Sequence, residues 1–220
     1  MMRKESQMIF QIISTRAAVW TLAPLVAAGL AIAAPVAAQS GNALSVIQSH
    51  FKSTTSMTAD FVQTDRNGQR LSGELTLKRP GKIRFQYQKD VPLLIVGDGS
   101  SLTMIDYQVK QVQRWPVKNS PLSALLDPDR DLSQYAKLLP TANDDVLSVE
   151  VRDPKRPEYG TITMVFVRDG GAPAGLRLRG WVALDSQNNR TRIDLSNQKF
   201  NVAVADSAFK WTDPRPRQRR

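Results

Sequence analysis

Residues 73–87, GELTLKRPGKIRFQY, form two runs in which apolar and polar residues alternate on either side of Arg-Pro-Gly-Lys. Alternation with a period of two is typical of β-strands. Pro followed by Gly fits a type II turn, because Gly readily adopts a positive φ. The two strands share an apolar face, formed by Leu75, Leu77, Ile83, Phe85 and Tyr87. The same parity places Arg79 at the end of this face, so the segment predicts a β-hairpin with a guanidinium beside an apolar interior.

The N-terminal region has the pattern of a cleavable signal peptide. An uncharged run rich in Ala, Leu and Val extends from residue 17 to residue 38, and it is preceded by Arg3, Lys4 and Arg16. Val36 and Ala38 are small residues at the positions typical of a cleavage site. The run is also long enough for a membrane anchor, but its alanine richness and its cleavage site favour a signal. We therefore expect residues 1–38 to be removed on export.

The charge and the residue types present restrict the chemistry of the exported chain. Loss of residues 1–38 removes three basic residues and one acidic residue, which lowers the formal charge from +10 to +8. This excess favours an acidic partner such as nucleic acid, an anionic lipid surface or an acidic protein, and export excludes nucleic acid. There is no Cys, and the single His50 is expected on the flank of a helix. Disulfides, metal sites and nucleophilic catalysis therefore lack suitable residues.

Carboxylates are the remaining candidates for catalysis. Asp127, Asp129, Asp131 and the pair at 144–145 lie beside Pro, Asn or predicted helix starts, where capping and turn roles explain them. A small exported hydrolase that uses these carboxylates is an alternative. The sequence favours a binding protein rather than an enzyme.

Alternation with a period of two continues through most of the chain after residue 56. It predicts strands near residues 57–64, 71–78, 82–88, 92–97, 102–107, 110–115, 146–152, 160–168, 175–184, 190–196 and 208–212. Asn-Gly at 67–68 and Asp-Gly at 98–99 are strong hairpin signals. A helix is expected over residues 42–54, because Leu44, Ile47 and Phe51 recur at helical spacing.

Residues 119–140 interrupt the alternation and predict two short helices. Ser120 can cap the first helix, and Pro121 fits its first position. Asp127-Pro128 ends this helix, and Asp131 can cap the second. The apolar faces of the two helices contain Leu122, Leu125, Leu126, Leu132, Tyr135, Leu138 and Leu139.

About eleven strands and about three short α-helices predict a mainly β (α+β) fold. Antiparallel sheets of more than about ten strands curl or split, and so few helices cannot cover a flat one. We therefore expect an unclosed antiparallel β-barrel with a helical lid over residues 39–212, followed by a basic disordered tail at 213–220. The predicted interior is lined by Leu75, Leu77, Ile83, Phe85, Tyr87, Leu176, Leu178, Val182 and Leu184, and the predicted lid contains Leu122, Leu125, Leu126, Leu138 and Leu139.

Arg79 has two interpretations in this fold. As a turn residue it can extend its guanidinium into solvent. Alternatively, it lies at the rim of the interior and donates hydrogen bonds to lid carbonyls or to the polar head of a ligand, because a guanidinium presents several planar donors. An apolar pocket with one or two polar anchors is the usual construction of a lipid site.

Taken in order along the chain, these segments resemble the LolA family of periplasmic outer-membrane lipoprotein carrier proteins. The resemblance covers residues 43–211. It rests on Phe61-x-Gln63, the hairpin of residues 73–87, Asp98-Gly99, Ser120-Pro121 before a Leu-rich segment, and Phe-Lys-Trp at 209–211.

The resemblance implies a periplasmic carrier with no catalysis and no cofactor. Such a protein takes lipoprotein acyl chains from an inner-membrane ABC transporter and delivers them to an outer-membrane receptor lipoprotein. The resemblance also implies that Arg79 contacts the lid and switches it between closed and open states. The absence of Cys argues against the related receptor, which is itself lipid-anchored. We expect a monomer, and a periplasmic carrier of free lipid or glycolipid with the same fold is the alternative.

Overall fold

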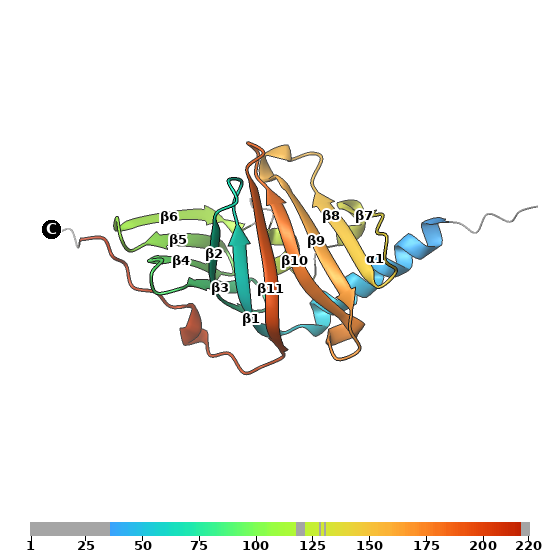
Figure 1. Cartoon of the computed structure of the whole chain (residues 1–220), viewed down its shortest axis with the longest axis horizontal. Coiled ribbons are helices and arrows are strands. Elements are labelled where there is room, and N and C mark those ends of the chain that lie inside the picture. The colour runs from blue at the N-terminus through green and yellow to red at the C-terminus, as the bar shows by residue number, and fades with distance from the viewer. Residues whose placement is uncertain (1–35, 118–121, 128, 130, 217–220) are drawn as a thin grey trace, which may run out of the picture. The chain divides into compact units, whose positions relative to one another are not determined.

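Eleven antiparallel strands form one sheet in the described part of the chain (Figure 1). The computed structural model describes residues 36–117, 122–127, 129 and 131–216, with side chains from residue 42 onward. The strands are β1 (Ser56–Thr64), β2 (Arg70–Lys78), β3 (Lys82–Tyr87), β4 (Leu93–Asp98), β5 (Ser101–Asp106), β6 (Gln111–Pro116), β7 (Ala136–Leu139), β8 (Val146–Arg152), β9 (Thr161–Arg168), β10 (Leu176–Leu184) and β11 (Arg190–Phe200).

The strand order makes the sheet a curled and open structure. β1 to β6 and β7 to β11 are two meanders of sequential neighbours, joined where β1 pairs with β11. β6 and β7 are the two edges of the sheet and are not paired with each other. In Figure 1, β3 to β6 run steeply across the direction of β1 and β11, which shows how strongly the sheet twists. The predicted unclosed antiparallel barrel of eleven strands is therefore confirmed.

The main core lies on the face of the sheet that packs against α1 (Val36–Ser53) and α2 (Ser123–Leu126). Ile47 and Phe51 of α1, like Leu125 and Leu126 of α2, are buried among apolar side chains from most of the strands. Complete burial of one such side chain contributes about 1.5–3 kcal/mol, so these four residues attach both helices to the sheet. No helix in the described part of the chain is long and apolar enough to cross a membrane.

The segment after β6 is less helical than the sequence predicts. α2 has four residues, and the expected second helix is reduced to one turn of 3-10 helix, η2 (Leu132–Gln134). Asp131 caps this turn as expected, by accepting a hydrogen bond from the amide of Ser133. Ser120, Pro121 and Pro128, to which the sequence assigned cap and breaker roles, lie outside the described residues.

Leu138 and Leu139 belong to strand β7 and not to a lid helix, so the prediction of a helix there was wrong. Residues 136–139 pair with residues 148–151 of β8 in antiparallel register. Hydrogen bonding along an existing sheet edge outweighs the high helix propensity of Ala, Lys and Leu here, because so short a helix has little stability of its own.

A β-bulge in β10 changes which residues face the core. The pairing of β10 with β9 shifts by one residue at Arg179. The extra residue reverses the alternation of side chains beyond it. Trp181 is consequently buried in the core, whereas Val182 and Leu184 are half-buried on the opposite face. The prediction that Val182 and Leu184 share the face of Leu178 was therefore wrong.

The chain after β11 crosses the outer face of the sheet, where the sequence predicted a further strand at 208–212. Residues 206–209 form the 3-10 helix η5 (Asp206–Phe209). Asp206 accepts hydrogen bonds from Lys78 and Lys82, which flank the β2–β3 turn. Phe209 is buried in a second, smaller core with Leu94, Val96 and Ile105. The Phe-Lys-Trp segment is thus apolar because it covers β4 and β5 from outside, not because it joins the sheet.

Candidate functional site

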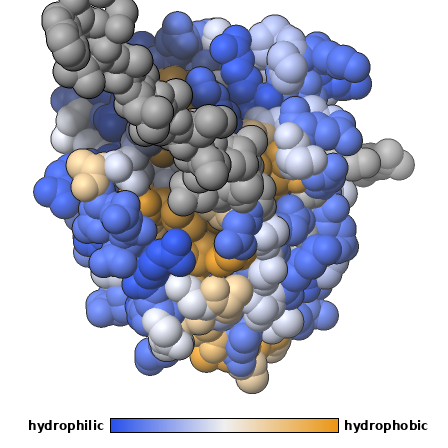
Figure 2. Space-filling model, turned by 90° about the vertical axis from the view of Figure 1, so that its right-hand side faces the viewer, coloured by the Kyte–Doolittle hydropathy of each residue, from blue (hydrophilic) through white to orange (hydrophobic). Residues whose placement is uncertain are grey.

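The interior is apolar and closed to water. Seven of the nine residues predicted to line it are at most 4% exposed, namely Leu75, Leu77, Ile83, Phe85, Tyr87, Leu176 and Leu178. Leu125 and Leu126 of α2 are buried in the same cluster, and Leu122 packs against it. The α2 leucines thus occupy space within the apolar interior. Figure 2 shows that apolar residues also gather at the centre of one face of the molecule, within a hydrophilic surround.

Arg79 connects α1 and α2 at the end of the interior beside the β2–β3 turn, which we call the mouth. Its Nε donates a hydrogen bond of 2.8 Å to the carbonyl of Thr54, directly after α1. Its Nη1 donates one of 2.8 Å to the carbonyl of Leu125 in α2. The guanidinium carbon lies 5.2 Å from the centre of the Phe51 ring, a cation–π distance. The arginine therefore points inward, as the strand parity predicts, and contacts the lid.

The backbone of the turn adds a second bond to the same helix. The Gly81 amide donates to the carbonyl of Leu126 at 3.2 Å, next to the bond from Arg79 to Leu125. The last carbonyls of a helix have no partner inside it and need an external donor. These two hydrogen bonds, from Arg79 and Gly81 to successive α2 carbonyls, are called the clasp below. The clasp holds α2 against the turn through two bonds, one of them charge-assisted.

The guanidinium of the clasp stays charged at neutral pH. Burial lowers the pKa of Arg79 to about 10, and the nearby carboxylate of Asp127 opposes this shift. With a pKa near 10, the protonated form exceeds the neutral form by about a thousandfold at pH 7. Partial burial of a charge is costly unless hydrogen bonds compensate it, and the carbonyls of Thr54 and Leu125 supply them.

Two glycine turns meet beside the clasp. Gly81 has φ of +72°, the positive value expected of it, and the Arg79–Pro80 peptide bond is cis, which the sequence does not indicate. A Cβ at position 81 would lie 2.6 Å from the Cα of Gly99 in the β4–β5 turn. Any side chain at this position would therefore push the two turns apart.

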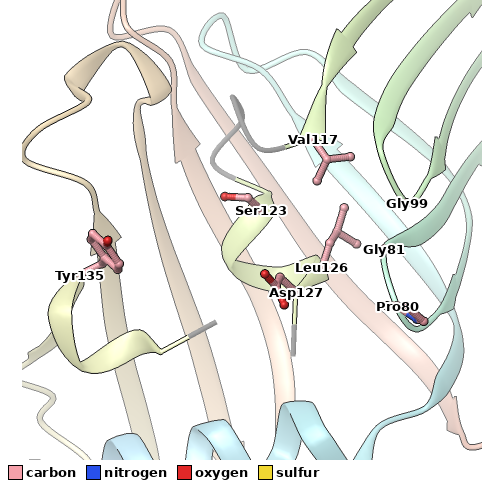
Figure 3. A pocket seen from close by; sticks show the side chains of 8 residues that line it. All are labelled: Pro80, Gly81, Gly99, Val117, Ser123, Leu126, Asp127 and Tyr135. Atoms are coloured by element: carbon pink, nitrogen blue, oxygen red, sulfur yellow. The ribbon is translucent and has the colours of Figure 1, made fainter. Parts of the chain in front are cut away.

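A pocket of about 370 Å³ opens at the mouth (Figure 3). It lies between α2 and the two glycine turns, and it is lined by Pro80, Gly81, Gly99, Val117, Ser123, Leu126, Asp127 and Tyr135. Figure 3 shows α2, with Leu126 and Asp127, between Tyr135 on one side and the turns at Gly81 and Gly99 on the other. The lid therefore borders this pocket on one side and the apolar side chains of the interior on the other.

His50 is a buried residue that the sequence did not reveal. Instead of lying on a helix flank, it is 2% exposed, and its ring contacts Phe51, Phe166 and Phe200. Its Nδ1 donates a hydrogen bond of 2.9 Å to the carbonyl of Pro173. Burial lowers the pKa of His50, and the positive charge of Arg79 adds to this effect. Helical spacing gave no sign of this burial, because an amphipathic surface helix is expected to expose the residues beside its apolar stripe.

The chain is similar in sequence to outer-membrane lipoprotein carrier proteins. Residues 52–212 match the family described as "Outer membrane lipoprotein carrier protein LolA". The outer-membrane lipoprotein carrier protein of Chromobacterium violaceum is 32% identical over 201 residues, covering 88% of this chain and 92% of that protein. The same-named protein of Dechloromonas aromatica is 30% identical over 189 residues, covering 82% and 88%.

Solved structures resemble the chain more distantly. A DUF1329 family protein from Desulfovibrio piger is 14% identical, with a TM-score of 0.49 over 80% of this chain and 97% of that one. A LolA superfamily protein from Nitrosomonas europaea is 11% identical, with a TM-score of 0.39 over 78% and 98%. The fold described above rests on the strand pairing of this chain.

Proposed function

Since the chain belongs to the LolA family of outer-membrane lipoprotein carrier proteins, we propose that it holds lipoprotein acyl chains in the apolar interior beneath α2. The observation that carries this proposal is the clasp. An interior lined by apolar side chains is closed by leucines of a four-residue helix, and that helix is held by two hydrogen bonds. The family is one of carriers, and the interior offers binding rather than chemistry.

The energetics of opening suit a carrier that must release what it binds. Displacing α2 breaks one charge-assisted bond of about 1.5–3 kcal/mol and one neutral bond of about 0.5–1.5 kcal/mol. It also uncovers Leu125 and Leu126, at about 1.5–3 kcal/mol each. Each methylene that replaces them contributes about 0.8 kcal/mol. Burial of about ten methylenes therefore offsets the opening cost, and the net affinity stays moderate.

Arg79 is the switch in this proposal. In the closed state its donors are paired with Thr54 and Leu125 carbonyls. When an acyl chain enters, α2 moves away and the guanidinium exchanges the Leu125 carbonyl for water or for the polar end of the cargo. Loss of cargo restores the bond. Because the closed state is stabilised by this bond, the bond also favours release.

The partners and the location follow from the family assignment as further parts of the proposal. Cargo would come from an inner-membrane ABC transporter and pass to an outer-membrane receptor lipoprotein, so the carrier would work in the periplasm after removal of residues 1–38. No energy source is required at handover if the receptor binds the acyl chains more tightly than the carrier does.

Native mass spectrometry of the carrier purified from a bacterial periplasm tests this proposal. We expect a bound lipoprotein whose acylated N-terminus is retained in the complex. Leu77→Glu places a charge in the interior and should abolish this binding, whereas Thr76→Glu, on the neighbouring outward-facing residue, should not. Bound free lipid or glycolipid in place of lipoprotein would favour the alternative carrier. An empty protein, or equal binding by both variants, would refute storage in the interior.

A further inference from the structure

The pairing of β1, β2 and β3 arranges the interior side chains in levels below the mouth. Leu77 pairs with Ile83 next to the turn, whereas Phe61 pairs with Gly73, and Gly73 with Tyr87, at the opposite end. Four aromatic side chains gather at and next to this far level. We call them the floor, and they are Phe61, Phe85, Tyr87 and Trp181.

The rings of the floor are packed edge to face. Phe61 lies 5.1 Å from Tyr87 and 5.3 Å from Phe85, with interplanar angles of 89° and 82°. Phe85 in turn lies 6.2 Å from Trp181 at 73°. These separations and angles are those that aromatic pairs favour. All four side chains are at most 4% exposed, so the floor closes the far end of the interior to water.

Two further features fix the floor in place. The hydroxyl of Tyr87 donates a hydrogen bond of 2.6 Å to Oε1 of Gln63. Gly73, opposite Phe61 in the strand pair, has no room for a side chain, because a Cβ there would lie 2.1 Å from the carbonyl oxygen of Gln86. Trp181 faces inward because of the bulge at Arg179. Ring positions are thus set by backbone geometry and by a partly buried hydrogen bond.

The region between the floor and the mouth is built differently. Its strand and α2 side chains are the aliphatic Leu77, Ile83, Leu125 and Leu126, and the ring of Phe51 from α1 lies beside Arg79 at the mouth. When α2 leaves, the space vacated by its leucines lies on the mouth side of the floor. Aliphatic side chains can also change rotamer at low cost, whereas interlocked rings cannot move singly without opening a cavity.

We propose that the floor, formed by Phe61, Phe85, Tyr87 and Trp181, sets the maximum acyl-chain length that the interior accepts. This inference rests on the proposed function. From Arg79 to Gly73 the strand advances six residues, or about 20 Å at about 3.4 Å per residue. An extended chain of single bonds advances about 1.2 Å per bond, since three backbone bonds span at most about 3.6 Å. The interior therefore accommodates about sixteen carbons between mouth and floor.

Competition binding with saturated fatty acids of ten to twenty carbons tests the proposal. The purified carrier is loaded with the fluorescent probe 1-anilinonaphthalene-8-sulfonate, and each acid is titrated to displace it. We expect affinity to rise by up to about fourfold per added carbon, the value for a fully buried methylene. Beyond about sixteen carbons, added methylenes stay in water and the affinity should level off.

Substitutions at the floor should move this limit. Phe61→Leu and Trp181→Leu each replace an aromatic ring of the floor with a smaller side chain. Each should shift the plateau towards longer acids by about two carbons or more. Phe166→Leu is the matched control, because Phe166 is equally buried and also makes two edge-to-face contacts, with His50 and Phe51 beside α1. It should leave the plateau length unchanged. Trp181→Phe is a milder variant for use if a leucine variant does not fold.

The possible results distinguish a failure of the proposed length limit from a failure of the proposed carrier function. A plateau that shifts in the floor variants alone supports the proposal. Binding that keeps rising to twenty carbons in the unsubstituted protein overturns the floor and leaves the carrier function intact, as does a plateau that moves equally in Phe166→Leu. Failure of every acid to displace the probe contradicts acyl-chain binding itself, and the floor is overturned with it.

Discussion

At the mouth, α2 is held by two hydrogen bonds to successive carbonyls, whereas at the floor four aromatic rings are packed against one another between strands. A hydrogen bond to a carbonyl can be exchanged for one to water at a net cost of about 0.5–3 kcal/mol. A packed ring cannot leave without creating a cavity. The two closures of the same interior therefore differ in reversibility. In the proposed function, the mouth is therefore the end that opens during transport, and the floor is the end that stays closed.

The largest expected effect is on stability at the floor. Phe61→Ala removes the ring that contacts both Tyr87 and Phe85, and it should lower the free energy of unfolding by about 3–5 kcal/mol. Urea denaturation followed by circular dichroism measures this change. A loss below about 1 kcal/mol would mean that the floor is as loosely packed as the mouth, and the contrast between the ends would disappear.

Arg79→Leu tests the reversible end. The closed state loses a charge-assisted bond, so the cargo-bound state gains relative to it, and handover to the receptor should slow by about 10- to 100-fold. Acceptance from the transporter should persist. Both steps can be scored separately in a reconstituted transfer assay. Arg84→Leu is the matched control, because Arg84 donates to the Ala208 and Lys210 carbonyls on the outer face. Normal handover by Arg79→Leu would reduce Arg79 to a structural turn residue.

A fall in pH should also affect the stability of the mouth and of the floor differently. His50, near the mouth, has its pKa lowered by burial, so it binds a proton more readily when unfolded than when folded. Its contribution to stability is present above the unfolded pKa of about 6.5 and is lost as the pH falls, by up to about 1.4 kcal/mol per pH unit. At the floor, burial raises the pKa of Tyr87 to about 12, which adds no acid dependence. Unfolding free energies at pH 5 to 7 should fall less steeply for His50→Gln. Identical slopes would show that His50 does not contribute.

Truncation of the lid should cost little. Leu126→Ala removes a side chain that borders the mouth pocket on one side and the interior on the other. The protein around α2 can adjust more than a filled core can, so the loss of unfolding free energy should fall below the usual range of about 2–5 kcal/mol. Leu178→Ala, within β10, should fall inside it. Equal losses measured by urea denaturation would mean that the closed mouth is packed as tightly as the sheet.

The smallest effect is expected from the net charge of the carrier. Charge affects the rate at which the carrier meets its partners, but not the packing of the mouth or of the floor. A carrier of formal charge +8 after loss of residues 1–38 should dock to acidic partners more slowly at high salt. Removal of residues 213–220 takes away four arginines and one aspartate and should slow delivery less than salt does. Stopped-flow transfer rates at about 50 and 500 mM salt measure both effects. Unchanged rates would mean that the basic surface has no role in docking.

The first meander could be predicted from the sequence almost completely. Its alternation and its turn residues are local signals, and strands such as β2 and β3 begin and end within one residue of the expected positions. Arg79 could be placed at the mouth for the same reason, since parity and the adjoining turn decide where it points. One of its two partner carbonyls, that of Leu125, belongs to the lid as expected, because helix ends need donors, whereas the bond to the carbonyl of Thr54 was not expected.

The remaining errors arise where distant contacts decide the outcome. The sequence of residues 136–139 predicts a helix, but these residues form the edge strand β7. Their conformation is decided by pairing with β8. Val182 and Leu184 face away from the core because of one extra residue at Arg179, and alternation carries no sign of a bulge. Trp181, a floor residue, faces the core because of the same shift, whereas uninterrupted alternation from Leu178 would turn it outward. The burial of His50 depends on Phe166 and Phe200, which are far away in sequence.

The brevity of α2 has a consequence for the speed of transport. The β2–β3 turn is held by strand pairing, by the α2 carbonyls on one face and by Asp206 on the other, whereas α2 itself has four residues. Opening therefore needs the displacement of one helical turn and not the rearrangement of a sheet. Motions of this size take microseconds to milliseconds. The waiting time of each delivery cycle should then be set by diffusion across the compartment and by how long the carrier dwells on its partners.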